Sequence, residues 1–227
     1  MIPKKIHYCW FGPKPLPKLA VNCLETWKKL LPAYELNLWD ESNSPMQSDF
    51  VQQAYVAKKY AFVSDYVRFW VLFQHGGIYL DTDIFLIRSF DDLLENETFF
   101  AWETDQKIII SCGVIGAIPR QEFIKTVLMY YEQLQFNNAS VADFIIPRIV
   151  TSCYIDYPSK GDVTIYPYDY FYPFPYEEKE NINKFMKYKT ENTYAVHLWN
   201  ISWGKSIDKL RDRILFYYRQ IRKYFNK

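Results

Sequence analysis

The sequence predicts an α/β fold with a mostly parallel central sheet. Segments rich in β-branched and aromatic residues alternate along the chain with segments whose apolar positions recur at helical spacing. Such alternation favours parallel pairing, because each helix carries the chain back to the edge where the next strand begins. The 227 residues are enough for one domain with a sizeable core. Ligands of such sheets bind beyond the carboxyl ends of the strands.

The first half of the chain is expected to contain three or four strands and three helices. In order, they are a strand in KIHYCWF, a helix over residues 19–30, a strand in YELNLWD, helices over 49–59 and 64–75, and a strand in IYLDT. Pro32 ends the first helix, and the pair Gly76-Gly77 ends the third. The segment IFLIRS either continues the last strand or pairs beside it.

The second half continues the alternation. Its expected elements are strands in TFFAWE and IIISCGVIGAI, helices over residues 121–134 and 141–154, strands in DVTIYP and YAVHLWN, and a long C-terminal helix. We expect one domain over residues 1–205, followed by this helix over 206–227.

Composition gives little indication of nucleic-acid binding, because the net charge is only +1. The four cysteines show no zinc-finger spacing and no disulfide framework, which favours a reducing compartment. The first residues have no apolar region of signal-peptide length, and no run of eighteen apolar residues occurs. These patterns predict a cytoplasmic protein.

The stretch GGIYLDTD places two carboxylates two residues apart after an apolar segment. If the strand extends through them, Asp81 and Asp83 project to the same face and repel each other. A divalent cation between them, Mg²⁺ or Mn²⁺, would offset the repulsion. One D-x-D arises by chance about once in such a chain, so the surrounding residues have to support the interpretation.

The preceding helix supplies that support. In FVSDYVRFWVLFQHGG, the side chains of Asp65, Arg68 and Leu72 share one helical face. Alone, the Asp–Arg pair would be read as an ordinary ion pair on a helix surface. Here the helix leads directly into Gly-Gly and D-x-D.

Three blocks together resemble the DXD-containing sugar transferases of glycosyltransferase family 32: IPKKIHYCWFG, FVSDYVRFWVLFQHGGIYLDTDIFLI and HLWNISW. The chain is most similar to bacterial capsular and surface-polysaccharide transferases, and more distantly to fungal mannosyltransferases and clostridial glucosylating toxins. The resemblance implies a GT-A (Rossmann-like) nucleotide-sugar-binding fold and retention of anomeric configuration. It also implies Mn²⁺ or Mg²⁺, a nucleotide-sugar donor, with a UDP-sugar favoured over GDP-mannose, and a glycan or lipid-linked glycan acceptor.

The resemblance also implies roles for individual residues. Trp10 would stack on the nucleotide base, although a buried strand-end aromatic is the alternative. The other implied roles are Asp65 and Arg68 at the donor sugar and diphosphate, Tyr79 and Asp81 at ribose and sugar, Asp81, Asp83 and His197 as metal ligands, Asn200 at the donor, and Ser202 and Trp203 towards the β-phosphate. We expect Asp65, Arg68, Asp81 and Asp83 to be the catalytic group. The toxins carry a carboxylate where His197 stands, and relatives often have an Asn where Ser111 and Cys112 stand.

The expected mechanism is front-face attack, in which the leaving phosphate accepts the acceptor's proton. The alternative is double displacement, for which Asp65 and Glu103 are candidate nucleophiles by position.

Three other functions are considered. A phosphohydrolase or nucleotidyltransferase would need further carboxylates or a phosphate-binding glycine loop. A sugar-binding protein without turnover would not need Arg68 or the D-x-D carboxylates, and a toxin-like transferase would modify a protein.

The sequence leaves the roles of two segments undecided. The stretch YPYDYFYPFPY, residues 166–176, either forms a stacking wall for the acceptor or packs into its own domain. The tail over 206–227 has an apolar seam with seven basic residues against one Asp from Lys209 onward. One alternative is that the seam packs on its own domain, or on a second copy of the chain to form a homodimer. The other is that the helix binds anionic lipid at the inner face of the membrane.

Overall fold

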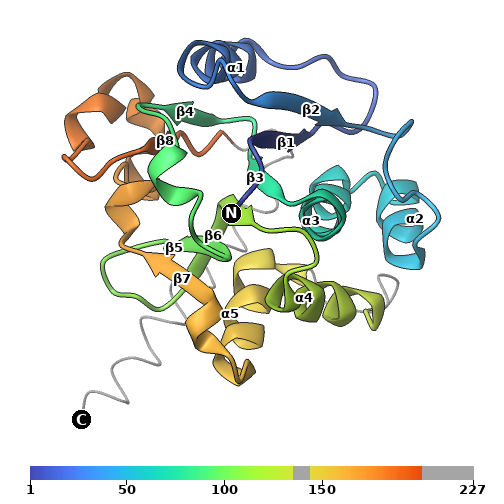
Figure 1. Cartoon of the computed structure of the whole chain (residues 1–227). Helices are drawn as coiled ribbons and strands as arrows, with labels where there is room; N and C mark the ends of the chain where they lie inside the picture. The colour runs from blue at the N-terminus through green and yellow to red at the C-terminus, as the bar shows by residue number, and fades with distance from the viewer. Residues whose placement is uncertain (135–143, 201–227) are drawn as a thin grey trace.

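The computed structural model describes residues 1–134 and 144–200, and its centre is a six-stranded sheet (Figure 1). Across this sheet the strands are β2 (Glu35–Trp39), β1 (Lys5–Cys9), β3 (Gly77–Leu80), β6 (Ile110–Ala117), β5 (Thr98–Trp102) and β7 (Val163–Tyr166). Only β6 runs against its neighbours, since β1 pairs in parallel with β2 and β3, and β5 with β7. The predicted α/β class and mostly parallel sheet are confirmed.

A separate two-stranded sheet pairs β4 (Ile84–Leu86) with β8 (Ala195–His197) in antiparallel fashion. The segment IFLIRS therefore does not extend β3 but turns away from the large sheet. Its register places Ile84 opposite His197. This pairing brings the C-terminal part of the described chain next to the residues that follow β3.

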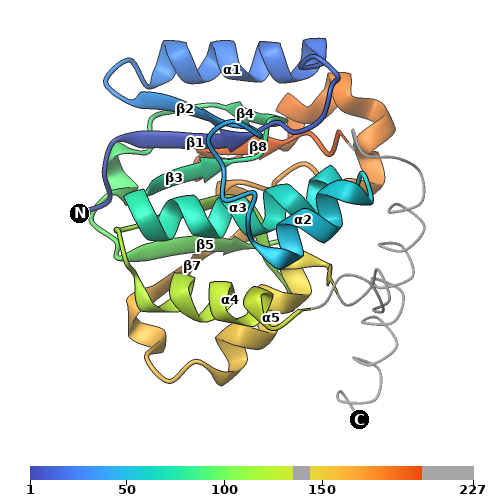
Figure 2. The same ribbon diagram turned by 90° about the vertical axis from the view of Figure 1, so that its right-hand side faces the viewer.

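Helices cover both faces of the large sheet (Figures 1 and 2). One face carries α2 (Asp49–Val56), α3 (Tyr60–His75), α4 (Glu122–Glu132) and α5 (Ile146–Asp156). The other carries α1 (Lys18–Leu30), the small sheet, and the 3-10 segments η1 (Asp91–Leu93), η4 (Tyr168–Tyr170) and η5 (Tyr176–Tyr188); η3 (Lys160–Asp162) precedes β7. Each face has its own apolar core.

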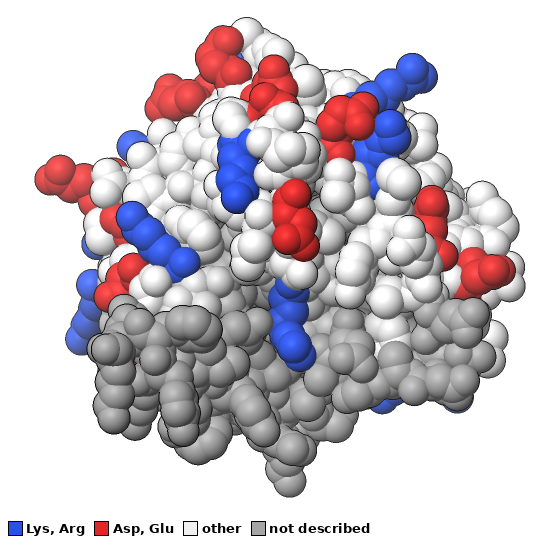
Figure 3. All heavy atoms as spheres, turned by 90° about the horizontal axis from the view of Figure 1, so that it is seen from below, with Lys and Arg blue, Asp and Glu red and all other residues white. Residues whose placement is uncertain are grey.

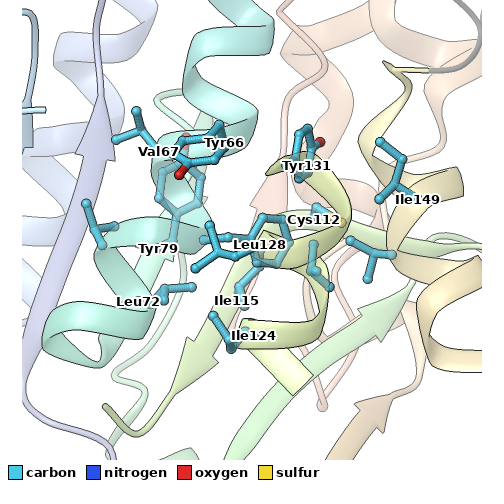
Figure 4. Packing of buried hydrophobic residues seen from close by; sticks show 14 of the residues in the cluster. Tyr66, Val67, Leu72, Tyr79, Cys112, Ile115, Ile124, Leu128, Tyr131 and Ile149 are labelled. Carbon is cyan, nitrogen blue, oxygen red and sulfur yellow. The ribbon is translucent and has the colours of Figure 1, made fainter. Parts of the chain in front are cut away.

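Figure 4 shows the packing on the face that carries α3, α4 and α5. Leu72 of α3, Ile115 of β6, and Ile124 and Leu128 of α4 meet in one cluster, with Ile149 of α5 at its side. Each is less than 10% exposed, and burying an aliphatic side chain of this size stabilises a fold by roughly 1.5–3 kcal/mol. The cluster fixes α3 against the sheet, and α3 carries two of the predicted site residues.

Three helices differ from their predicted bounds by three residues or more, and the one predicted over 49–59 ends at Val56. The third helix begins at Tyr60 rather than at residue 64, because Phe62 and Val63 already pack into the core. Lys58, with φ of +56°, separates it from α2. The helix predicted from residue 141 begins at Ile146 in the described chain, and residues 135–143 lie outside it.

The pair Gly76-Gly77 makes the tight connection from α3 to β3. Both have positive φ, +60° and +107°. A Cβ on Gly76 would lie 2.6 Å from Cδ of Pro119, and one on Gly77 would lie 2.8 Å from the carbonyl oxygen of Lys5. Both the backbone conformation and the close packing therefore require glycine here.

Lys and Arg are interspersed with Asp and Glu over the described part of the face in Figure 3. The four cysteines are buried free thiols.

Within the described residues, no helix combines the length and hydrophobicity needed to cross a bilayer. The predicted C-terminal helix and the domain boundary at residue 205 lie outside the described residues.

Candidate functional site

The predicted site residues that the structure describes gather around one cavity of about 240 Å³. It lies beyond the ends of β1 and β3 and beside α3. The sequence-predicted residues that line it are Trp10, Asp65, Arg68, Tyr79, Asp81, Asp83, His197 and Asn200. Ser202 and Trp203 lie outside the described residues.

Arg68 is the most heavily bonded of these side chains. Its Nη2 donates to Oδ1 of Asp65 at 2.7 Å, and its Nη1 donates to the carbonyl oxygen of Cys112 at 2.8 Å. The same Nη1 lies 3.2 Å from Oδ1 of Asp81, and the guanidinium stacks 4.6 Å from the centre of the Tyr79 ring. The side chain is only 6% exposed. It is therefore a fixed positive charge at the cavity wall.

Asp65 is buried on the same helix, one turn before Arg68. Burial raises the pKa of its carboxyl from 3.8 to about 7, although the charge of Arg68 acts in the opposite direction. Asp65 therefore changes protonation near neutral pH.

The two D-x-D carboxylates do not project side by side from a strand, as the sequence suggested. The strand β3 ends at Leu80, and residues 81–83 form a turn in which the Ile84 N–H donates to the carbonyl oxygen of Asp81 at 3.0 Å. The turn gives the carboxylates different partners. Asp81 accepts from the Tyr79 hydroxyl at 3.0 Å and faces Arg68, whereas Asp83 lies 3.2 Å from Nε2 of His197.

Asp83 and His197 form a second pair of ionisable side chains at the cavity. Oδ2 of Asp83 also accepts from the backbone N–H of Asn200 at 2.7 Å. Burial raises the pKa of the Asp83 carboxyl, but His197 and the Asn200 N–H outweigh burial, and the net pKa lies below its ordinary value. Asp83 is therefore ionised at neutral pH.

The residues present fit a divalent cation. Ligand atoms of Asp81, Asp83 and His197 lie within 4.8 Å of one another. Nδ1 of His197 is buried and has no hydrogen-bond partner among the described residues, which is unusual for a buried polar atom. Two carboxylates and an imidazole can bind Mn²⁺ or Mg²⁺. The three residues that the sequence resemblance implies as ligands thus lie together, and both their binding of an ion and the identity of that ion stay predictions.

Trp10 and Tyr79 supply the rings of the cavity. Trp10 follows β1, is half-buried, and its Nε1 donates to the carbonyl oxygen of Lys14 at 2.6 Å. Tyr79 is buried between Arg68 and Asp81. Asn200 is exposed and contributes its backbone N–H rather than its side chain to Asp83.

Sequence reasoning missed Trp199 and Gly113. Trp199 has a φ of +55°, and its ring centre lies 4.0 Å from that of His197. Positive φ is rare for an aromatic residue, and no residue pattern around Trp199 predicts this conformation. A Cβ on Gly113 would lie 3.2 Å from Oδ2 of Asp81, and the Asp81 N–H donates to its carbonyl oxygen at 2.8 Å. The glycine therefore leaves room for the carboxylate.

The comparisons with known proteins agree with this geometry. Residues 17–100 match the family model of the glycosyltransferase sugar-binding region containing the DXD motif. An uncharacterised glycosyltransferase of Acanthamoeba polyphaga mimivirus is 23% identical over 90% of this chain and 84% of its own length. Inositol phosphoceramide mannosyltransferase 3 of Schizosaccharomyces pombe is 31% identical over 60% of this chain, which spans 39% of that protein.

Among solved structures, the PaToxG glycosyltransferase superposes with a TM-score of 0.56 at 20% identity, covering 69% of this chain and 70% of its own. The fold is that of the GT-A glycosyltransferases, as the resemblance implied. The resemblance to DXD-containing sugar transferases is likewise confirmed. Membership of family 32 and the capsular type stay predictions.

Removing the Arg68 guanidinium should destabilise the fold strongly. We expect Arg68→Ala to lower the free energy of unfolding by about 3–5 kcal/mol, because it leaves the buried carboxyl of Asp65 and the partly exposed carboxylate of Asp81 without their cation. The control is Lys125→Ala, which breaks the Glu122–Lys125 pair at the same spacing but with side chains 68% and 47% exposed. That change should cost no more than about 1 kcal/mol. Equal losses in urea denaturation would contradict the structural role of Arg68.

The raised pKa of Asp65 predicts a pH-dependent stability. Its protonated form is favoured by folding, so its contribution is complete below pH 3.8 and is lost as the pH rises through about 7. We expect the stability of the parent protein relative to Asp65→Asn to fall between pH 4 and pH 8. Comparing the two proteins isolates the contribution of Asp65, because every other ionisable residue is the same in both. A difference that stays level or grows with pH would show that the pKa of Asp65 is not raised.

Proposed function

We propose that this chain, whose residues 17–100 contain the sugar-binding region of the DXD glycosyltransferases, is a metal-dependent retaining glycosyltransferase. It would move a hexose from a nucleotide-sugar donor to a glycan or lipid-linked glycan acceptor during capsular or surface-polysaccharide synthesis. The observation that carries the proposal is one cavity that holds Asp81, Asp83 and His197 beside the buried guanidinium of Arg68.

The charges of the site suit a diphosphate leaving group. A bound Mn²⁺ or Mg²⁺ would neutralise the negative charge that develops on the phosphate as the glycosidic bond breaks. Asp81, Asp83 and His197 are the residues that would hold the ion. Arg68 adds positive charge at the same cavity, and its bonds to Asp65 and to the Cys112 carbonyl hold it in place before reaction.

Donor binding would use the remaining wall of the cavity. Trp10 offers an aromatic face for the base, and Asp65 offers a carboxylate that accepts from sugar hydroxyls when ionised. The fungal relative is named a mannosyltransferase, so a donor screen by thermal shift should include GDP-mannose as well as the favoured UDP-sugars.

The two routes to retention make different demands on the protein. Asp65 is held by Arg68 at 2.7 Å, which makes its carboxylate a weak nucleophile and favours front-face attack. In that step the acceptor oxygen bonds to the anomeric carbon, the bond to phosphate breaks, and the acceptor proton passes to the leaving phosphate. Glu103, buried at the cavity margin, is the carboxylate left for double displacement. Front-face attack is consistent with Glu103→Gln retaining turnover, and double displacement through Glu103 is not.

Asp83→Asn tests the metal role. We expect transfer to fall by about 100-fold or more, because a neutral amide is a poor ligand for a hard cation and the leaving group loses its stabilisation. Transfer of the sugar from the donor is measured with added Mn²⁺, and the melting temperature is measured with and without the ion. The control is Asp156→Asn, an exposed carboxylate at the end of α5. Full turnover by chelated, metal-free protein would show that the reaction does not use an ion.

Trp10→Ala tests the base-stacking role. Stacking is equally strong in the ground and transition states, so its loss should raise the donor KM roughly 5- to 100-fold with a much smaller effect on kcat. The companion variant Trp10→Phe keeps a ring while removing the N–H that donates to Lys14, and should retain most of the affinity. A defect confined to kcat in steady-state kinetics would place Trp10 elsewhere in the mechanism.

A further inference from the structure

A second cavity of about 420 Å³ adjoins the donor cavity. The two share Glu103 and Trp199 in their walls. The loop between β5 and β6 forms one side of the second cavity, and the aromatic stretch with η5 forms the other. A molecule bound in the second cavity would therefore lie next to a donor sugar in the first.

Aromatic rings form much of this wall, and the residues are Tyr168, Tyr172, Tyr176, Tyr188 and Trp199. Hydrogen bonds and ring contacts fix the orientation of three of these side chains. The Tyr172 hydroxyl accepts from the N–H of Val114 at 2.9 Å, Nε1 of Trp199 donates to the carbonyl oxygen of Phe174 at 2.7 Å, and Tyr176 packs edge-on against Trp199. Tyr172, Tyr176 and Trp199 are themselves less than 10% exposed, whereas Tyr168 and Tyr188 are half-buried and keep ring surface that can pack against the apolar face of a sugar.

The polar part of the wall is acidic. Glu103, Asp105 and Glu177 line the cavity, together with the amide of Gln106, and none of the described residues that line it is basic. Lys179, which is not part of the lining, donates to the Tyr176 hydroxyl at 2.7 Å. Carboxylates and an amide accept hydrogen bonds from hydroxyl and amino groups, whereas they repel carboxylates and phosphates.

We propose that this second cavity is the acceptor site, and that the sugar it takes is neutral or carries an amine rather than a carboxylate or phosphate. The proposal rests on the glycosyltransferase function proposed above and names the acceptor class of that site. The reacting hydroxyl enters past Trp199 and Glu103. Its oxygen bonds to the anomeric carbon as the bond to the nucleoside diphosphate breaks, and its proton leaves on the diphosphate.

The first test compares acceptors. The full chain with Mn²⁺ and the donor identified by thermal shift is given methyl glucoside, methyl glucosaminide or methyl glucuronide, and similar sets built on galactose and mannose. Free sugar released from the donor by water is measured in parallel, because this hydrolysis depends on the donor cavity alone. We expect the anionic glycosides to show a KM at least about tenfold above that of the neutral and amino glycosides.

The second test changes the cavity wall. Asp105→Lys/Glu177→Lys should lower the KM for the glucuronide severalfold relative to the glucoside. Asp156→Lys/Glu180→Lys makes the same change in net charge at exposed residues outside the lining and should leave this preference at the parent value. Tyr168→Ala should lower the ratio of transfer to hydrolysis, while Tyr130→Ala, on the exposed side of α4, should not.

The outcomes separate the two proposals. If no nucleotide sugar is hydrolysed and none raises the melting temperature, the proposed glycosyltransferase function is wrong. The proposed acceptor site is then wrong as well, because it depends on that function. If the donor is hydrolysed but glucuronide is used as well as glucoside, or Tyr168→Ala behaves like Tyr130→Ala, the acceptor site alone is overturned.

Discussion

The site depends on one buried charge, the guanidinium of Arg68. A buried cation is tolerated only when its donors are matched by acceptors, and three parts of the fold supply them. Asp65 comes from the same helix, the Cys112 carbonyl from β6, and Asp81 from the turn after β3. The need to satisfy Arg68 therefore fixes α3, β6 and the D-x-D turn relative to one another.

The same requirement explains how two nearby carboxylates are accommodated. Asp81 faces Arg68, and Asp83 faces His197, so each has a cationic or protonatable partner within the protein. The turn at residues 81–83 makes this division by giving the side chains different surroundings. The carboxylates stay close enough to share an ion while their mutual repulsion is offset by different groups.

The sequence was informative where local periodicity or spacing determines the structure. Helical spacing placed Asp65 and Arg68 on one face, and the alternation of elements predicted the parallel sheet. The sequence was uninformative where the structure depends on a contact with a segment far away along the chain. The strand β4 leaves the large sheet because its partner β8 lies more than a hundred residues later, and no local pattern encodes that pairing. The carbonyl of Cys112 is a backbone group, so its bond to Arg68 leaves no signature in residue type. Nor could the sequence foresee the positive φ of Trp199.

The aromatic stretch at residues 166–176 packs into its own domain and also lines the second cavity, and its role as a stacking wall for the acceptor stays a proposal. Phe171 and Phe174 are fully buried in the core beneath the small sheet, while Tyr168, Tyr172 and Tyr176 line the second cavity. The backbone of the same stretch binds β8, because the carbonyl of Phe171 accepts from the N–H of His197 at 3.1 Å. Core packing of this segment therefore positions both the imidazole of the candidate metal site and the rings of the adjoining cavity. A substitution that loosened Phe171 would disturb both cavities together, although it touches neither.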